Sequence, residues 1–284
     1  MASTFHDDRP IAVYEPTVTG LPPLRRYFAG VWERRPFIWH LARTDMKSQH
    51  YDTVLGFVWL VADPLLLAAT FYLIRAVFKS GGSAEQNRYL IAHLIMGVSF
   101  FYFVRDVLQG SAQSIQKNKV MVLNTGAPRG VFPVVALVRA TFDLIPALIV
   151  YFVVHAILRQ PWGTSLMSLP FALVLLAMFS FGVGLLLAPA VVFVPDIGAL
   201  LPYVVRIWMY VTPVMYAVSE IPAGVRPLLK LNPLFPFFAM LESIVQGHQP
   251  SMGDVVASGL WAVGALLVGT IVFLLRERDY AVRL

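Results

Sequence analysis

The chain has 284 residues, of which 58% are hydrophobic and only 13% are charged, and its formal net charge at pH 7 is +6. Because an average soluble domain has about a quarter charged residues, this composition excludes an ordinary soluble protein and indicates an integral membrane protein. The absence of cysteine excludes disulfides and thiolate metal sites, and membrane topology explains the basic excess better than nucleic-acid binding does.

The chain starts with a polar segment, residues 1–21, which predicts a flexible tail without a cleavable signal peptide. An amphipathic segment follows over residues 22–53, where Leu24, Phe28 and Trp32 share one helical face and arginines occupy the rest. A basic amphipathic helix with aromatic residues on its apolar side is typical of the membrane interface. The same face also suits packing on a partner subunit, and the two alternatives are compatible.

Six apolar stretches are long enough to cross a bilayer core of roughly 30 Å. They predict an all-α integral membrane protein in which residues 54–284 form one unit with six transmembrane helices. An even number of spans places both termini on the same side of the membrane. The predicted spans are residues 54–77, 90–108, 131–158, 166–194, 197–218 and 255–275.

The basic residues between these spans predict the orientation, because Lys and Arg are enriched on the cytoplasmic side. Fourteen lie on the side of the termini and six on the opposite side, so both termini are expected in the cytoplasm. The first set is Arg9, Arg25, Arg26, Arg34, Arg35, Arg43, Lys47, Arg105, Lys117, Lys119, Arg129, Arg276, Arg278 and Arg283. The second set is Arg75, Lys79, Arg88, Arg159, Arg226 and Lys230.

The longest connection on the side of the termini covers residues 110–130. Residues 111–121 predict a short polar helix held between two spans, which is typical of an element that docks a cytoplasmic partner. An ordinary connecting loop is the alternative. The residues expected at this contact are Ile115, Lys117, Asn118, Lys119 and Met121.

Residues 219–247, before the last span, stay apolar but are interrupted by Pro222, Pro227, Pro233 and Pro236. Each proline lacks an N–H and cannot continue a helix, so the pieces are too short to span. Irregular apolar backbone at membrane depth is tolerated only against protein or a water-filled cavity. The pattern therefore predicts a re-entrant pair of short helices beside a pathway through the membrane.

Several ionisable side chains fall inside predicted spans, among them Asp63, Arg139, Asp143 and Arg206, and such residues are costly there and usually face protein or water. Arg139 and Asp143 are four residues apart, which predicts an ion pair on one helix face. Arg206 has no partner in its own helix, so it pairs across helices or faces the pathway. Asp63 precedes Pro64 and is expected at a local break. No cluster of ligands accompanies the lone histidines, so no metal site is expected.

Several motifs resemble those of ABC-2-type export permeases. The stretch RTDMKSQHYDTVLGFVWLVADPLL, from Arg43 to Leu66, is similar to the start of the first span of that family. The stretch from Gly182 to Tyr216 resembles its fourth and fifth spans, although Pro195 stands where the family tends to have a basic residue. The Asn232–Pro233 pair resembles an element before the last span. The similarity is greatest to polysaccharide and O-antigen export permeases, including galactan exporters of mycolic-acid bacteria.

This resemblance implies a homodimer in the plasma membrane of a bacterium, where it serves lipopolysaccharide or cell-wall biogenesis. Two copies of a separate ATPase subunit drive such a permease, and a lipid-linked glycan passes through a channel at the dimer interface. The sequence contains no G-x-x-x-x-G-K-[ST] phosphate loop. ATP and Mg²⁺ are therefore expected on the partner subunit, which docks on residues 111–125, and no catalytic residue or cofactor is expected in this chain.

Aromatic rings stack on the C–H faces of sugars, so aromatic residues in and near the spans are candidates for the pathway, with an interfacial belt as the alternative. An exporter of a small lipid or drug is the second hypothesis. A membrane glycosyltransferase is disfavoured because Asp7 and Asp8, the only adjacent acidic pair, lie in the tail. The pathway candidates are Phe100, Phe101, Tyr102, Tyr203, Arg206, Trp208, Tyr210 and Tyr216. The candidates for a periplasmic gate are Pro213, Pro222, Pro227, Asn232 and Pro233.

Overall fold

The computed structural model describes residues 23–51, 56–78, 84–222 and 224–283, and its secondary structure in these ranges is entirely helical. The predicted tail over residues 1–21 lies outside the described residues. The α-helices are α1 (Leu24–Glu33), α2 (Arg35–Tyr51), α3 (Trp59–Phe78), α4 (Ala84–Lys117), α5 (Lys119–Asn124), α6 (Val131–Ile157), α7 (Leu169–Phe193), α8 (Pro195–Val211), α9 (Arg226–Leu229), α10 (Phe235–Val245), α11 (Met252–Arg276) and α12 (Tyr280–Arg283). Short 3-10 turns are η1 (Gly56–Val58), η2 (Thr164–Ser168), η3 (Val218–Glu220) and η4 (Glu277–Asp279).

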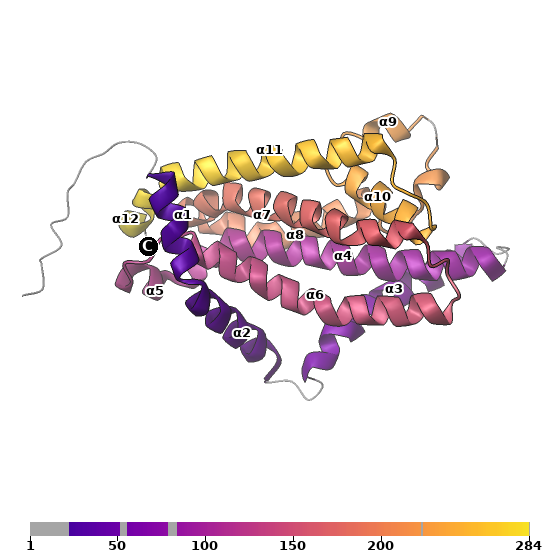
Figure 1. Cartoon of the computed structure of the whole chain (residues 1–284), viewed down its shortest axis with the longest axis horizontal. Helices are drawn as coiled ribbons and strands as arrows, with labels where there is room; N and C mark the ends of the chain where they lie inside the picture. Colours follow the sequence, from indigo (N-terminus) through magenta and orange to yellow (C-terminus); the bar gives the residue numbers. More distant parts are fainter. Residues whose placement is uncertain (1–22, 52–55, 79–83, 223, 284) are drawn as a thin grey trace, which may run out of the picture.

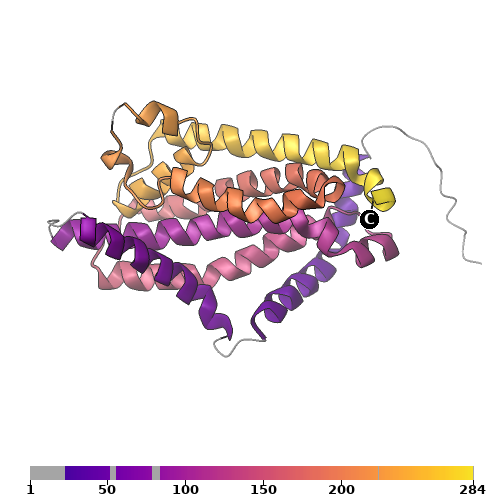
Figure 2. The same ribbon diagram turned by 180° about the vertical axis from the view of Figure 1, so that it is seen from behind.

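The long helices α4, α6, α7, α8 and α11 run along the long axis of the molecule (Figure 1). Helix α7 lies at the centre and packs against α11 and α4, and α4 packs in turn against α6. Helices α1, α5 and α12 gather at one end, here called the terminal end, and α9 and α10 lie at the opposite loop end (Figure 1). In the view from behind, both α3 and α8 lie in front of α4 (Figure 2).

Five helical stretches of the described chain are long and apolar enough to cross a membrane, namely Trp59–Val77, Gln86–Lys117, Val131–Ile157, Thr164–Phe193 and Met252–Asp279. They correspond to the first four predicted spans and the last one. The predicted fifth span over residues 197–218 contains α8, which has 17 residues and ends at Val211, just before Pro213. The structure thus confirms an all-α protein with five candidate spans.

Helix α4 differs from its prediction, because it has 34 residues and continues without interruption to Lys117. The expected end at residue 108 and the separate helix over residues 111–121 are wrong. Ser111, Ala112 and Ile115 are fully buried, so the helix continues against its neighbours after the apolar stretch has ended. A short break at Asn118 then separates α4 from α5.

Two glycines let α7 and α11 cross in close contact. A Cβ atom on Gly269 would lie 2.0 Å from the carbonyl oxygen of Gly182, and one on Gly182 would lie 2.4 Å from the backbone of Ala265. Small residues at a crossing allow two membrane helices to gain backbone packing that larger side chains would prevent. This crossing holds the last candidate span against the centre of the bundle.

The amphipathic segment forms two helices with different surroundings. In α1, the apolar side chains Leu24, Phe28 and Trp32 are 47%, 52% and 69% exposed, which suits a membrane interface. Helix α2 instead packs on α6 through the buried residues Ile38 and Ala42.

A polar junction anchors α1 to the rest of the terminal end. The Tyr27 hydroxyl accepts a hydrogen bond from the backbone N–H of Gly130 at 2.8 Å. The preceding residue, Arg129, donates its backbone N–H to the Glu277 carboxylate at 2.7 Å. Burial, and then the nearby Glu277 carboxylate, raise the pKa of Tyr27, so its hydroxyl remains neutral at physiological pH.

The loop end contains two short helices, α9 and α10, within residues 219–247, where a pair of short helices was predicted. Pro227 and Pro236 lie in the first turns of these helices, where a missing N–H costs nothing. Helix α10 is almost entirely buried and packs against α4, α7 and α11. The prolines therefore start helices here as well as interrupting the apolar stretch.

Candidate functional site

A stripe of polar residues follows one face of α4. Ser99, Tyr102, Asp106, Gln109 and Gln113 are spaced by three or four residues, so their side chains project from the same side of the helix. Much of the rest of α4 is buried and apolar. Polar groups on a helix that crosses a membrane require protein, water or a polar ligand around them, so the stripe marks the side of α4 that faces such surroundings.

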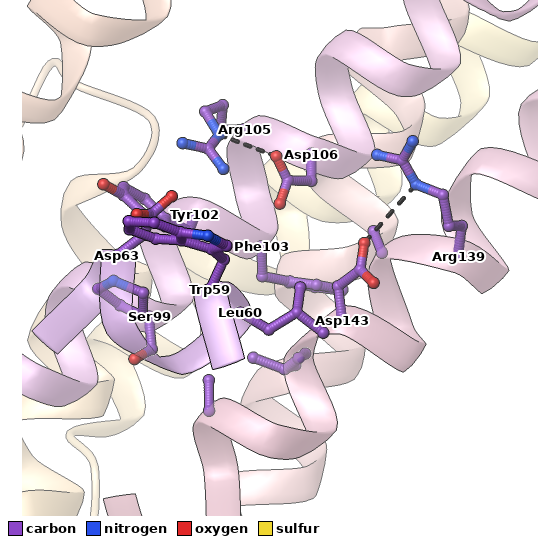
Figure 3. Close-up of a pocket in the computed structure, with 14 residues that line it drawn as sticks. Trp59, Leu60, Asp63, Ser99, Tyr102, Phe103, Arg105, Asp106, Arg139 and Asp143 are labelled. Carbon is purple, nitrogen blue, oxygen red and sulfur yellow. Dashed lines mark hydrogen bonds and ion pairs between the residues drawn. The ribbon is translucent and has the colours of Figure 1, made fainter. Parts of the chain in front are cut away.

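Two charged residues of α6 face this stripe. The Arg139 Nε atom lies 3.6 Å from Asp143 Oδ2, and the two side chains are 14% and 10% exposed. On α4, Arg105 Nε donates to Asp106 Oδ1 at 2.8 Å. Figure 3 shows these two charged pairs projecting from neighbouring helices into one space. The Arg105 guanidinium also lies 4.0 Å from the centre of the Tyr102 ring, within cation–π range.

Three adjoining cavities meet at this cluster, and Asp106 and Arg139 line all three. The first, called here the α3 chamber, has about 150 Å³ and lies between α3, α4 and α6. The second also has about 150 Å³ and extends towards the terminal end, where Asp45 and Lys117 line it. The third, called here the cavity between α3 and α8, has about 670 Å³; it is lined mainly by residues of α4 and α8, together with Leu67 of α3 and Arg139 of α6. Together the three cavities form the polar groove.

Three buried polar atoms that line the groove have no hydrogen-bond partner within the described part of the chain. They are Arg139 Nε, Asp143 Oδ1 and Gln109 Nε2. A buried donor or acceptor without a partner costs about 1–3 kcal/mol, and more when it is charged. The groove is therefore built to contain water or a ligand with hydrogen-bonding groups.

The charges around the groove balance along its full length, but not within each cavity. The α3 chamber has three carboxylates and two guanidinium groups, whereas the cavity between α3 and α8 has three guanidinium groups and one carboxylate. The charged residues that line the groove are Asp45, Asp63, Arg105, Asp106, Lys117, Arg139, Asp143 and Arg206.

The predicted pathway aromatics divide between the groove and the core. Tyr102 lies in the polar stripe, and Arg206 and Tyr210 line the cavity between α3 and α8. Phe101 touches the same cavity although only 1% of it is exposed. Phe100, also predicted for the pathway, is fully buried on the side of α4 that faces away from the stripe and does not line the groove.

The remaining predicted aromatics lie along and beyond α8. Tyr203 is 63% exposed on the outer face of α8. Trp208 is turned away from the groove, since it lines an apolar cavity of about 660 Å³ between α7 and α11 and its Nε1 donates to Asn232 Oδ1 at 2.7 Å. The Tyr216 hydroxyl donates to the carbonyl of Val211 at 3.2 Å. Trp208 and Tyr216 thus fix the end of α8 and do not line the groove.

Asn232 connects the end of α8 to the start of α10. Its side-chain oxygen accepts from Trp208 and from the N–H of Leu234 at 3.0 Å, and its amide donates to Thr212 Oγ1 at 3.0 Å. Among the other predicted gate residues, Pro213 is buried and Pro233 lines the apolar cavity. Pro222 and Pro227 are exposed at the loop end.

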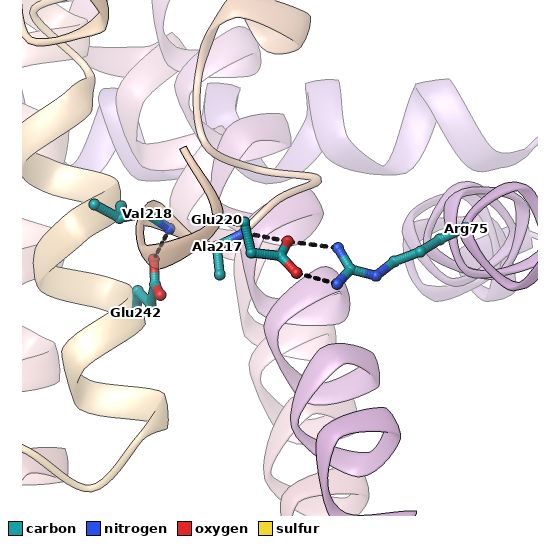
Figure 4. Close-up of polar contacts among 5 residues, drawn as sticks. All are labelled: Arg75, Ala217, Val218, Glu220 and Glu242. Atoms are coloured by element: carbon teal, nitrogen blue, oxygen red, sulfur yellow. Dashed lines mark hydrogen bonds and ion pairs between the residues drawn. The ribbon is translucent and has the colours of Figure 1, made fainter. Parts of the chain in front are cut away.

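A second polar tie at the loop end links α3 to the segment after α8. Arg75, near the end of α3, forms a bidentate ion pair with Glu220 of η3, with Nη1 2.6 Å from Oε2 (Figure 4). The N–H of Val218 donates to the Glu242 carboxylate of α10 at 2.7 Å (Figure 4). The turn between α8 and α9 is therefore held by the Arg75 guanidinium of α3 on one side and by the Glu242 carboxylate of α10 on the other.

The predicted docking residues do not form one surface. Ile115, predicted at the partner contact, is fully buried inside the bundle. Lys117 and Lys119 are exposed at the terminal end, and Met121 is 39% exposed. Asn118 lies at the break between α4 and α5, where its amide donates to the Ser114 carbonyl at 2.8 Å. Only the exposed members remain available to a partner.

The sequence interpretation missed Arg105, Asp106 and Gln109. Arg105 was counted among the loop charges because the second span was expected to end at residue 108, but it lies well inside α4. The signal that could have found these residues is the helical spacing of polar side chains from Ser99 to Gln113. A window average of hydrophobicity hides such a stripe, since it registers only the mean of the helix.

Comparison with known proteins gives a consistent result. Residues 37–245 match the family of ABC-2 type transporters. The chain is 26% identical to the O-antigen export system permease protein RfbA of Klebsiella pneumoniae over 200 residues, which cover 68% of this chain and 74% of that protein. It is 21% identical to the protein of the same name from Myxococcus xanthus over 255 residues, which cover 88% of this chain and 96% of that protein.

Proposed function

This chain belongs to the ABC-2 type transporter family, and from this premise we propose that it is the permease subunit of an ATP-driven exporter of a lipid-linked polysaccharide. The observation that carries the proposal is its similarity, over most of its length, to proteins named as O-antigen export system permeases. The polar groove supports it, because a hydroxyl-rich polymer requires polar surroundings inside the membrane.

The pathway proposed here is a channel between two copies of the chain. The groove opens between α3 and α8, and α8 exposes an apolar face that includes Tyr203, Ile207 and Tyr210. A second copy packed beside these helices would cover that face and enclose the groove. In this arrangement Arg206 faces the channel, where it would attract the pyrophosphate linkage of a lipid-linked glycan.

The topology proposed here has six spans and both termini in the cytoplasm of a bacterium. In addition to the five candidate spans, α8 and the turn after it, up to Ala217, cross the membrane as the fifth span in chain order. Helices α9 and α10 form a re-entrant pair at the periplasmic end. The preference of basic residues for the side of the termini supports this orientation. The Arg75–Glu220 and Asn232 contacts would then hold the outer end of the pathway closed.

A separate ATPase subunit supplies the energy in this proposal and carries the ATP and Mg²⁺. The chain contains no phosphate loop of its own. The exposed Lys117 and Lys119 and the short helix α5 present a basic surface at the terminal end, which suits contact with such a partner. Movement there would pass along α4 directly into the groove, because α4 reaches from the terminal end past the polar stripe.

The test is to deplete the protein in its native cell and to analyse lipid-linked glycans in the membrane and free glycan at the surface. We expect a long lipid-linked polymer to accumulate on the cytoplasmic side while surface glycan decreases, with restoration by the intact gene. An unchanged glycan pool with altered retention of a lipid or drug would contradict polysaccharide export and favour a small-molecule exporter.

A further inference from the structure

The lining of the α3 chamber combines two kinds of group that are suited to sugars. Trp59 is 37% exposed and lines the chamber together with Tyr102 (Figure 3). The charged groups Asp63, Asp106 and Asp143 line the same space. Aromatic rings offer an apolar face for C–H groups, while carboxylates accept hydrogen bonds from hydroxyl groups.

We propose that the α3 chamber is a contact site for neutral sugar units and that it disfavours anionic sugars and phosphate groups. The inference rests on the proposed function, since it specifies the class of glycan that the groove accepts. It adds to the polar groove a selective site that is set by three carboxylates, one each from α3, α4 and α6.

The unpartnered atoms of the chamber require a ligand that both donates and accepts. Asp143 Oδ1 is an acceptor and Arg139 Nε is a donor, and both are buried without a hydrogen-bond partner in the described chain. A sugar hydroxyl supplies a donor and an acceptor in one group and can satisfy either atom. A phosphate group that is fully ionised offers only acceptors, so it would leave the carboxylate oxygen unsatisfied.

The charges of the chamber also disfavour an anionic ligand. Arg105 already binds Asp106 at 2.8 Å, and Arg139 lies 3.6 Å from Asp143. Asp63 is the third carboxylate and has no additional guanidinium within this lining, so the chamber carries an excess of negative charge. Because low-dielectric walls strengthen electrostatic interactions, an entering anion is repelled more strongly here than at an open surface.

The natural absence of cysteine allows a direct test of access to the chamber. Leu60 lines the chamber, whereas Leu66 lies on the same helix, is 59% exposed and lines none of the three cavities of the groove. Single variants Leu60→Cys and Leu66→Cys, tagged and kept in native membrane vesicles with their partners, would be treated with neutral, cationic and anionic thiol reagents of similar size. The modified fraction is measured after purification.

We expect the Leu60→Cys thiol to react about tenfold faster with neutral and cationic reagents than with the anionic one, and Leu66→Cys to show no such preference. Adding Asp63→Asn to Leu60→Cys should reduce this discrimination, since it removes one negative charge. The cell's own glycan, released from its lipid, should slow modification at Leu60→Cys, and the same glycan after sulfation should not. Equal rates with all reagents, no reaction, or equal protection by the sulfated glycan would overturn the proposal.

The two proposals fail in different ways. If depletion leaves glycan export unchanged, polysaccharide export is wrong, while the thiol reactions still measure the charge preference of the chamber. If depletion blocks export but the exported glycan is polyanionic, the permease function stands and the neutral-sugar site is refuted.

Discussion

Arg139 and Asp143 carry opposite charges on a helix that is otherwise strongly apolar, and each is mostly buried. Their ion pair at 3.6 Å is longer than a good hydrogen bond, so the pair leaves polar atoms available to other partners in the groove. The two side chains therefore neutralise each other's charge, while Arg139 Nε and Asp143 Oδ1 can still form hydrogen bonds with water or a ligand.

The variant Arg139→Leu should destabilise the protein by about 3–5 kcal/mol, because it leaves Asp143 buried without its cation. The double variant Arg139→Leu with Asp143→Leu should recover most of this loss, since it removes both charges. Thermal unfolding of the purified protein in detergent measures the difference. A double variant that is less stable than either single variant would show that the two charges do not stabilise one another.

The variant Asn232→Ala should cost about 1–3 kcal/mol of unfolding free energy for each buried group that it leaves unpaired. It removes the acceptor of the Trp208 indole and the donor to Thr212. The exposed Asn124, at the end of α5, provides a matched control, and Asn124→Ala should change stability little. Equal unfolding temperatures for the two variants would contradict a structural role for Asn232.

At the scale of elements, close approach between helices organises the bundle. Helices α7 and α11 are in backbone contact at Gly182 and Gly269, and α4 approaches α7 at Gly184, where a Cβ atom would lie 2.6 Å from that of Ser111. These contacts bring α4 deep into the bundle on one side. They leave its polar stripe facing the groove on the other.

The variant Gly269→Leu should destabilise the protein by about 3 kcal/mol or more, because its side chain would have to displace the backbone of α7. Gly264→Leu is the matched control on the same helix, since nothing lies within 4 Å of a Cβ atom at Gly264. The fraction of folded protein after detergent extraction and the unfolding temperature distinguish the two. Similar losses for both would indicate that helix propensity, not the crossing, sets the effect.

For the whole molecule, α4 connects the exposed basic surface of the terminal end to the polar groove in a single rigid element. Lys117 is the last residue of the helix, and the groove residues Asp106 and Gln109 lie two to three turns before it. A helix of this length moves as one body, so a push at one end displaces the stripe as well.

The double variant Lys117→Glu with Lys119→Glu should lower glycan export and the coupling of ATP hydrolysis to it, while the chain still inserts into the membrane. Reversing two exposed charges weakens an electrostatic contact with the partner but leaves the fold intact. Lys230→Glu, an exposed charge at the loop end, is the control. Normal coupled export in the double variant would contradict docking at this surface.

The class of the protein and most of its helices could be predicted from the amino-acid sequence. Spans at residues 131–158, 166–194 and 255–275 were predicted within a few residues of α6, α7 and α11, because hydrophobicity over about 20 residues follows from local composition alone. The Arg139–Asp143 ion pair could also be predicted from the sequence, since both residues belong to one helix with fixed geometry.

The end of α4, and the division of its residues between the core and the groove, depend on packing that the sequence pattern does not contain. Ile115 and Phe100 are buried and Asp106 lines a cavity because of neighbouring helices that are distant in sequence. The same holds for Trp208, whose partner Asn232 belongs to the segment after α9. Burial and pairing are properties of packing between elements, so a sequence pattern can propose a polar face but cannot identify what lies against it.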